Sequence, residues 1–287
     1  MSKVTFNGKE YDVKGLAQDT VGLAEELAKN AKIIEPLPQG VDLTAEDDRK
    51  IRQQIVAIVD VLPRTIVTGW WNAFIAQYLP SLIAALKSAS LQTQKQYIST
   101  LIQILSLLPD PKESAYLRRF LRNPDLCAGV PTLIARHFVD GLNWKTPGGP
   151  GHICTLIIHT IHWCDASLGD DKKASIDHDV RVRLRDMLEG MTQLEGHALL
   201  GELQRVEIER LCGLLGAVEH LPGDQYARST RDYLEGQVDM CERFDCPGDG
   251  DASLRCSKCK CARYCGKECQ VWHWKNGHKL NCFEPVF

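Results

Sequence analysis

Apolar residues recur every three or four positions through most of the chain, from residue 16 to about residue 234. That period is typical of amphipathic α-helices. Three runs show it most clearly: Ile51, Ile55, Ile58 and Val59 behind an acidic first turn at 46–48; Trp70, Phe74, Tyr78 and Leu82; and Tyr97, Leu101, Ile104 and Leu108. The pattern predicts a mainly α body over residues 1–236.

Proline and glycine interrupt the helical pattern at regular intervals and predict roughly nine to eleven helices. The interruptions are Pro63, Pro80, Pro109, Pro111, Pro124, Pro131, residues 148–151, Gly169, Pro222 and Gly223. Short loops between neighbouring helices favour antiparallel packing, as in a multi-helix, HEAT- or armadillo-like array. A fixed repeat of about 34 or 40 residues, which would establish a solenoid, is not found.

The first residues alternate between apolar and polar side chains around Asn7 and Gly8. Asn-Gly tolerates positive φ at both central positions of a two-residue turn. This segment therefore predicts an N-terminal β-hairpin at about residues 3–13. Strand-like alternation does not return in the body, so the expected fold class stays mainly α.

Composition and charge narrow the class of protein. The chain has 287 residues, 44% of them apolar, which suits one large domain and a small one. Its formal charge of −3 gives no basic excess for direct nucleic-acid binding. The N-terminus lacks the plan of a signal peptide, and no apolar stretch reaches about 18 residues. We expect an intracellular protein of nucleus or cytoplasm, with no membrane contact, where reduced thiols favour zinc over disulfides.

The cysteines concentrate at the end of the chain. They form, with one histidine, four closely spaced pairs: Cys241 with Cys246, Cys256 with Cys259, Cys265 with Cys269, and His278 with Cys282. A structural zinc ion takes four sulfur or nitrogen ligands, so these pairs predict two structural zinc ions. With every position filled by protein, no site is open for an activated water, and we expect no catalytic zinc. Spacing alone leaves sequential and interleaved sites open.

The order of these residues resembles a MYND-type zinc finger over residues 241–282, about one seventh of the chain. The matching positions are Cys256 and Cys259, Tyr264-Cys265, Cys269-Gln270, Trp274, His278-Lys279 and Cys282. The resemblance implies interleaved sites. One zinc would bind Cys241, Cys246, Cys265 and Cys269, and the other Cys256, Cys259, His278 and Cys282.

The first pair departs from the usual plan, because four residues separate Cys241 from Cys246 where two are typical. This spacer resembles a variant of fungal family members. Two spare side chains lie inside the module. His273 continues the helical stripe of Cys265 and Cys269 and would replace a first-site ligand if Cys241 were misassigned, whereas Cys261 falls where the family has no ligand.

A second stripe of the same predicted helix carries Gln270 and Trp274, about 100° from the cysteine stripe, so both side chains can project outward. The resemblance implies that Gln270 and Trp274 contact a short proline-containing peptide, with Tyr264 at its flank. The alternative is that Trp274 packs against Trp272 or the helical body as local core.

The expected function is therefore that of a zinc-binding interaction or adaptor protein with protein partners, not an enzyme. A ubiquitin-ligase component is an alternative because cross-braced zinc also builds RING modules, and a transcriptional co-regulator is another. Some family members join the finger to a SET methyltransferase. That activity is disfavoured because the body has no Asn-His-Ser/Cys element, cofactor-type Gly-x-Gly strand or β-rich segment.

Three other groups of residues are expected to carry no binding or catalytic role. Cys154, His159, His162 and Cys164 lie in an apolar helical run, where cysteine and histidine are usually core residues. Cys127 and Cys212 are expected to be buried as well. The basic run at 181–185 is expected to be a solvated helix face and not a nucleic-acid patch.

Overall fold

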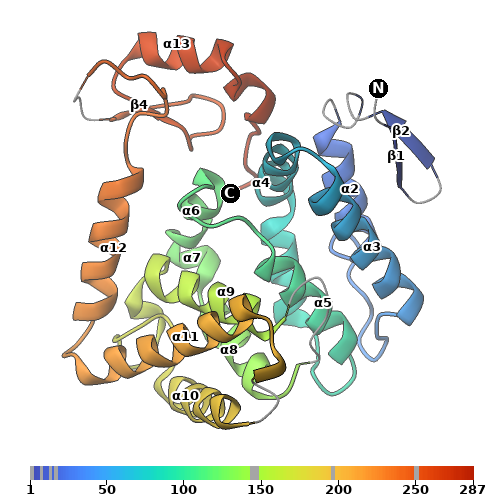
Figure 1. Cartoon of the computed structure of the whole chain (residues 1–287), viewed down its shortest axis with the longest axis vertical. Helices are drawn as coiled ribbons and strands as arrows, with labels where there is room; N and C mark the ends of the chain where they lie inside the picture. Colours follow the sequence, from blue (N-terminus) through green and yellow to red (C-terminus); the bar gives the residue numbers. More distant parts are fainter. Residues whose placement is uncertain are drawn as a thin grey trace.

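The computed structural model describes residues 3–6, 9–12, 15, 19–142, 149–194, 198–248 and 252–287. Within these ranges an N-terminal hairpin precedes a body of helices α2 to α12, and the finger follows (Figure 1). The body helices are α2 (Thr20–Asn30), α3 (Ala45–Val61), α4 (Arg64–Ser88), α5 (Lys95–Ser106), α6 (Ala115–Leu121), α7 (Pro124–Cys127), α8 (Val130–Val139), α9 (Pro150–Trp163), α10 (His178–Gln193), α11 (Glu202–His220) and α12 (Gln225–Val238).

The mainly α prediction is confirmed, and so is the N-terminal hairpin. Strands β1 (Lys3–Phe6) and β2 (Lys9–Asp12) pair antiparallel, with Val4 opposite Tyr11. The predicted Asn7-Gly8 turn lies outside the described residues. The body helices range from 4 to 25 residues in length, so their sizes give no fixed repeat unit. The HEAT- or armadillo-like arrangement stays a prediction.

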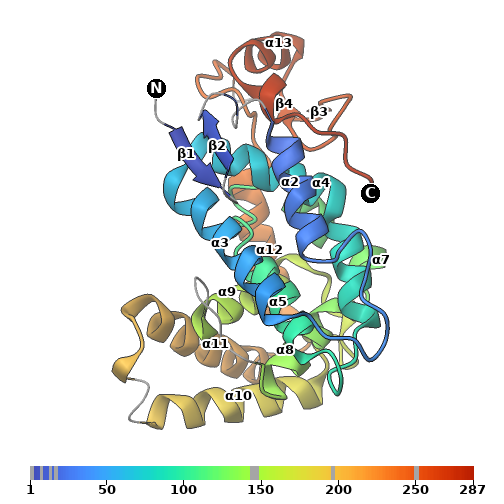
Figure 2. The same cartoon turned by 90° about the vertical axis from the view of Figure 1, so that its right-hand side faces the viewer.

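Helices α4 and α9 occupy the middle of the body. α4 packs against α2, α5 and α6, and α9 packs against α5, α8, α11 and α12. In both views the finger lies at one end of the long axis, above α4, while α10 lies at the other end (Figures 1 and 2). α12 runs from α11 up to the finger, so the last helix of the body leads the chain to the far end of the molecule.

Pro80 was expected to separate two helices, and this prediction is wrong. α4 continues through Pro80 for 25 residues. A proline inside a helix cannot donate to the carbonyl four residues earlier, here that of Ala76. The backbone N–H of Val286, from the end of the chain, donates to that carbonyl oxygen over 3.0 Å. A tertiary hydrogen bond therefore replaces the one that the proline removes.

The cysteines and histidines of α9 belong to the core. Cys154 and Cys164 are fully buried, and burial lowers the pKa of His159 and His162 to about 4, so both rings are neutral near pH 7. These residues form no metal-binding group in the part of the chain that the structure describes. Cys127, whose thiol lies beside that of Cys164, is buried as expected, whereas Cys212 on α11 is only half-buried. No helix in the described ranges has the length and apolar character that a membrane crossing requires.

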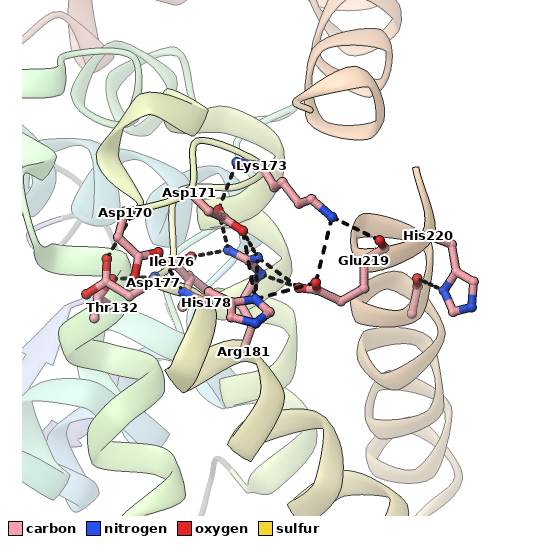
Figure 3. Close-up of polar contacts among 11 residues, drawn as sticks. Thr132, Asp170, Asp171, Lys173, Ile176, Asp177, His178, Arg181, Glu219 and His220 are labelled. Carbon is pink, nitrogen blue, oxygen red and sulfur yellow. Dashed lines mark hydrogen bonds and ion pairs between the residues drawn. The ribbon is translucent and has the colours of Figure 1, made fainter. Parts of the chain in front are cut away.

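Arg181 was expected on a solvated face, and this prediction is wrong. Its side chain lies completely inside the protein, at the seam between α10 and α11. The guanidinium donates to Glu219 Oε1 over 2.8 Å, to both carboxylate oxygens of Asp171, and to the carbonyl of Ile176 (Figure 3). Burial alone would lower the pKa of Arg181, but the two carboxylates raise it, so the side chain stays charged. Arg183, on another face of α10, is half exposed.

Candidate metal centre

Short elements carry the cysteines and the histidine of the finger. Strands β3 (Leu254–Arg255) and β4 (Arg263–Tyr264) pair antiparallel on either side of the loop that holds Cys256 and Cys259. Helix α13 (Lys267–Lys275) begins just after Cys265 and includes Cys269, and the 3-10 helix η3 (His278–Asn281) presents His278 just before Cys282. The Cys256–Cys259, Cys265–Cys269 and His278–Cys282 pairs therefore each lie on a short stretch of local structure, whereas Cys241 and Cys246 lie in the loop that follows α12.

The structure brings these side chains together in two groups of four. The first group is Cys241, Cys246, Cys265 and Cys269, and the second is Cys256, Cys259, His278 and Cys282. Within each group the ligand atoms all lie within 4.8 Å of one another. The two groups interleave along the chain, as the resemblance implied.

The spacing of these atoms fits a tetrahedral zinc ion. Zinc–sulfur bonds of about 2.3 Å place the sulfur ligands about 3.8 Å apart. Cys246 Sγ lies 3.4 Å from Cys265 Sγ and 3.8 Å from Cys269 Sγ, and Cys256 Sγ lies 3.7 Å from Cys282 Sγ. The two groups thus fit two structural zinc ions.

The spare candidates lie outside both groups. His273 Nδ1 is 3.1 Å from the hydroxyl of Tyr264, and its ring stacks on that of His278 with 4.9 Å between centroids. Cys261 is buried but does not reach either set of four ligand atoms. Cys241, and not His273, supplies the fourth sulfur of the first group.

Tyr264 was expected at the flank of a peptide groove, and its burial contradicts this. The side chain is 0% exposed and packs edge-on against the rings of His273 and His278. Burial is also the main reason that the pKa of its hydroxyl is raised. Tyr264 belongs to the small core of the finger beside the second metal group, where a peptide cannot reach it.

Gln270 and Trp274 lie on one face of α13, four residues apart. Gln270 is half-buried, and Trp274 is 38% exposed with its ring 5.9 Å from that of His278. Trp272 points to the opposite side of α13, where the guanidinium of Arg243 lies 5.2 Å from its ring. Trp274 therefore does not use Trp272 as a packing partner and keeps an accessible aromatic face.

Sequence reasoning missed the junction between the finger and the body. The residues after Cys282 run back across α4 and α6, and the ring of Phe287 meets that of Phe120 edge-on at 5.3 Å. Arg119 on α6 donates to the carbonyl oxygen of Cys259 over 2.8 Å and to a main-chain carboxylate oxygen of Phe287 over 2.6 Å. The apolar residues Phe283, Val286 and Phe287 beyond the last ligand are the sequence signal that could have indicated this docking.

Tyr116 on α6 anchors the same tail. Its hydroxyl accepts from the N–H of Phe283 over 2.8 Å and lies 3.1 Å from the carbonyl oxygens of Asn281 and Phe283. Only 4% of the residue is exposed, and burial raises the pKa of its hydroxyl, so the phenol is protonated throughout the physiological range. One side chain of the body thus holds the backbone directly after the second metal group.

Tyr116→Phe should lower the free energy of unfolding by about 1–3 kcal/mol, because the N–H of Phe283 loses its partner in a water-poor contact. Urea denaturation and hydrogen exchange at the Phe283 amide would measure this. Tyr233→Phe is the control, since Tyr233 is 66% exposed and should change stability by less than about 0.5 kcal/mol. Equal stability of the two variants would contradict the anchoring role of Tyr116.

Comparison with known proteins agrees with this geometry. The family model of the MYND finger matches residues 239–282. Ubiquitin C-terminal hydrolase 15 of Oryza sativa subsp. japonica is 54% identical over 33 residues, which are 12% of this chain and 3% of that protein. Ubiquitin carboxyl-terminal hydrolase 17 of Arabidopsis thaliana is 55% identical over 35 residues, 12% of this chain and 5% of that protein. These relatives match only the finger region, a small part of their length. No solved structure matches the chain.

Proposed function

Because residues 239–282 form a MYND finger, a zinc-binding protein-interaction domain, we propose that this chain is an adaptor whose finger binds a short proline-containing peptide of a partner protein. The observation that carries the proposal is the exposed face of α13, where Trp274 stands beside Gln270. An accessible indole on a rigid helix suits an extended, proline-rich segment. The two zinc ions hold that helix in place and are not themselves the binding surface.

The proposed role is not enzymatic. Each zinc group is completed by four protein side chains, which leaves no coordination position for a reacting water. The activity in the names of the hydrolases is not transferred to this chain, since the matches are confined to 31 to 39 residues in the region of the finger. A nuclear or cytoplasmic location is part of the proposal, because reduced thiols persist in those compartments.

Trp274→Ala should weaken binding of a partner peptide about 30-fold, since a central aromatic anchor contributes about 2 kcal/mol or more to such an interface. The peptide would be selected from an array of proline-containing sequences with the zinc-loaded full chain, and its affinity measured by fluorescence polarisation. Gln270→Ala should weaken the same interaction less, because it removes hydrogen bonds and little area.

Glu268→Ala is the matched control, since Glu268 is exposed on α13 but on a different face of the helix from Trp274. Zinc content is measured in parallel and should stay at two ions per chain in every variant. If Trp274→Ala and Glu268→Ala bind the selected peptide equally well, the proposed peptide site is wrong.

A further inference from the structure

A second surface feature lies where the finger meets the body. A hollow of about 360 Å³ opens between α6, α12 and the loops of the finger, and we call it the basic hollow. Its cationic lining residues are Arg118, Arg119, Arg122, Arg255, Lys260 and Arg263. Two carboxylates, Glu235 and Asp239, also line it. Cations thus outnumber carboxylates by six to two in a space contributed by both parts of the chain.

The carboxylates neutralise only part of this charge. Arg122 pairs with Glu235 over 2.9 Å and with Asp239 over 3.2 Å, and Arg263 shares Asp239. Both carboxylates of the lining are thus used in ion pairs with Arg122 and Arg263. The charges of these four residues cancel.

The other two arginines of α6 differ in how far their charge is neutralised. Arg119 donates to the carbonyl oxygen of Cys259 and to the main-chain carboxylate of Phe287, which neutralises it. Arg118 donates to the carbonyl oxygens of Pro111 and Lys112, with Glu242 more distant at 3.9 Å. The carbonyl oxygens that Arg118 binds satisfy its donors without cancelling its charge, so the basic hollow keeps a positive excess.

Arg255 and Lys260 form no ion pair with any residue that the structure describes, and both side chains are exposed. Lys260 also has a left-handed backbone, with φ of 58°. Glycine adopts this conformation without strain, whereas a lysine there is disfavoured. A charged side chain thus occupies, at the rim of the basic hollow, a position whose backbone favours glycine.

We propose that the basic hollow binds a small anion that carries two or more phosphate groups. Its volume lies within the range of about 300–1,000 Å³ typical of small-molecule sites. Arginine side chains match the geometry of phosphate oxygens, and several clustered cations favour several phosphates over one. The cations converge on one hollow and do not form a stripe, which is unlike a nucleic-acid surface.

An anion in the basic hollow would contact both the body and the finger. Arg118, Arg119 and Arg122 come from the body, whereas Arg255, Lys260 and Arg263 come from the finger. An anion between the two sets attracts both and reduces their mutual repulsion. Binding therefore strengthens the docking of the finger on the body, and this effect is independent of any peptide on α13.

The test is calorimetric titration of inorganic tripolyphosphate into the zinc-loaded full chain. We expect saturable binding of one ligand per chain that weakens as sodium chloride is raised. Arg255→Gln and Lys260→Gly should each weaken binding about tenfold, because each removes one charge-assisted contact. Lys260→Gly should leave the Tm of the free protein unchanged or raised, since glycine relieves the left-handed strain at this position.

Lys267→Gln and Lys275→Gln are the matched controls, because both lysines are exposed on α13 away from the basic hollow. Both control variants should bind tripolyphosphate as tightly as the wild type. Trp274→Ala should do so too, so this proposal and the peptide proposal can fail separately.

The proposal is overturned if Arg255→Gln and Lys260→Gly bind tripolyphosphate as tightly as the wild type. It is also overturned if the control variants lose affinity to the same extent, because that result indicates non-specific attraction or removal of zinc by the probe. Tighter binding of a doubly phosphorylated serine peptide than of tripolyphosphate would overturn the assignment to a small ligand.

Discussion

Cys259→Ser is expected to remove one zinc ion from the chain and to unfold the finger. Cys259 is 0% exposed and contributes one of the four ligand atoms of the second group. A structural zinc ion contributes about 10–16 kcal/mol to folding in finger peptides, and a serine hydroxyl is a poor replacement for a thiolate. The finger cannot compensate with apolar packing, because its described core is little more than Tyr264 and the ligands themselves.

Elemental analysis would count the zinc ions, with two per chain expected in the wild type and one or fewer in Cys259→Ser. Hydrogen exchange across residues 239–287 should rise to the level of an unfolded segment. The far-ultraviolet circular dichroism should keep most of its helical signal, because the helices of the body have their own core of residues such as Trp70 and Trp163.

Cys261→Ser is the matched control for this experiment. Cys261 is two residues away and also buried, but it belongs to neither ligand group, so both zinc ions should remain. The same comparison tests the first group. Cys241→Ser should lose a zinc ion, whereas His273→Ala should keep two. Retention of both ions in Cys259→Ser, or loss of one in Cys261→Ser, would contradict the ligand assignment.

Arg181→Met should lower the free energy of unfolding of the body by about 3–5 kcal/mol, the loss expected when one partner of a buried ion pair is removed. The remaining carboxylates of Asp171 and Glu219 are only 27% and 15% exposed, so water solvates them incompletely. Methionine keeps much of the volume of the side chain, so a cavity contributes little. The effect places Arg181 among the strongest single determinants of the body's stability.

Arg183→Met is the control on the same helix. Arg183 is 49% exposed and pairs with Asp140, which is 30% exposed, and such pairs contribute about 0–1 kcal/mol. Urea denaturation of both variants gives the two stabilities directly. A loss in Arg181→Met no larger than that in Arg183→Met would show that the buried network does not stabilise the fold.

The ion pair of Arg181 and Asp171 also makes the stability of the body depend on pH. Burial alone would raise the pKa of Asp171, but hydrogen bonds from Arg181 and from the N–H of Lys173 bring it below its ordinary value. Asp171 therefore contributes stability that is present above its unfolded pKa and is lost as pH falls through its folded pKa. In Arg181→Met the carboxylate of Asp171 loses the hydrogen bonds and the positive charge of Arg181, so its pKa should rise. The stability difference between wild type and Arg181→Met should then shrink on acidification, as denaturation at several pH values would show.

The features that the sequence predicted well depend on neighbours along the chain. Ile51, Ile55 and Ile58 are buried on α3 because helical spacing alone places them on one face. The ligand pairs of the finger are also local, since the two members of each pair are separated by five residues or fewer along the chain. Helical periodicity and ligand spacing can therefore be recognised in the sequence without knowledge of the fold.

The features that the sequence did not predict depend on distant partners. Glu219, which pairs with the buried guanidinium of Arg181, lies 38 residues from Arg181 in the sequence. Phe283 lies 167 residues from Tyr116, whose hydroxyl accepts its N–H. A basic residue in a helical pattern gives no sign of such a partner, because most arginines are solvated. The prediction that Pro80 ends a helix was wrong for the same reason. The N–H that replaces the missing donor belongs to Val286, 206 residues further along the chain.

The hydrogen bond between the carbonyl oxygen of Ala76 and the N–H of Val286 joins two segments that are synthesised at different times. Synthesis runs from the N-terminus, so α4 leaves the ribosome long before Val286 exists to donate to it. Ala76 is 0% exposed in the finished protein, where an unpaired carbonyl would be unfavourable. The segment that completes it begins directly after Cys282, a zinc ligand. The central helix of the body therefore reaches its final hydrogen bonding only after translation has passed the metal site.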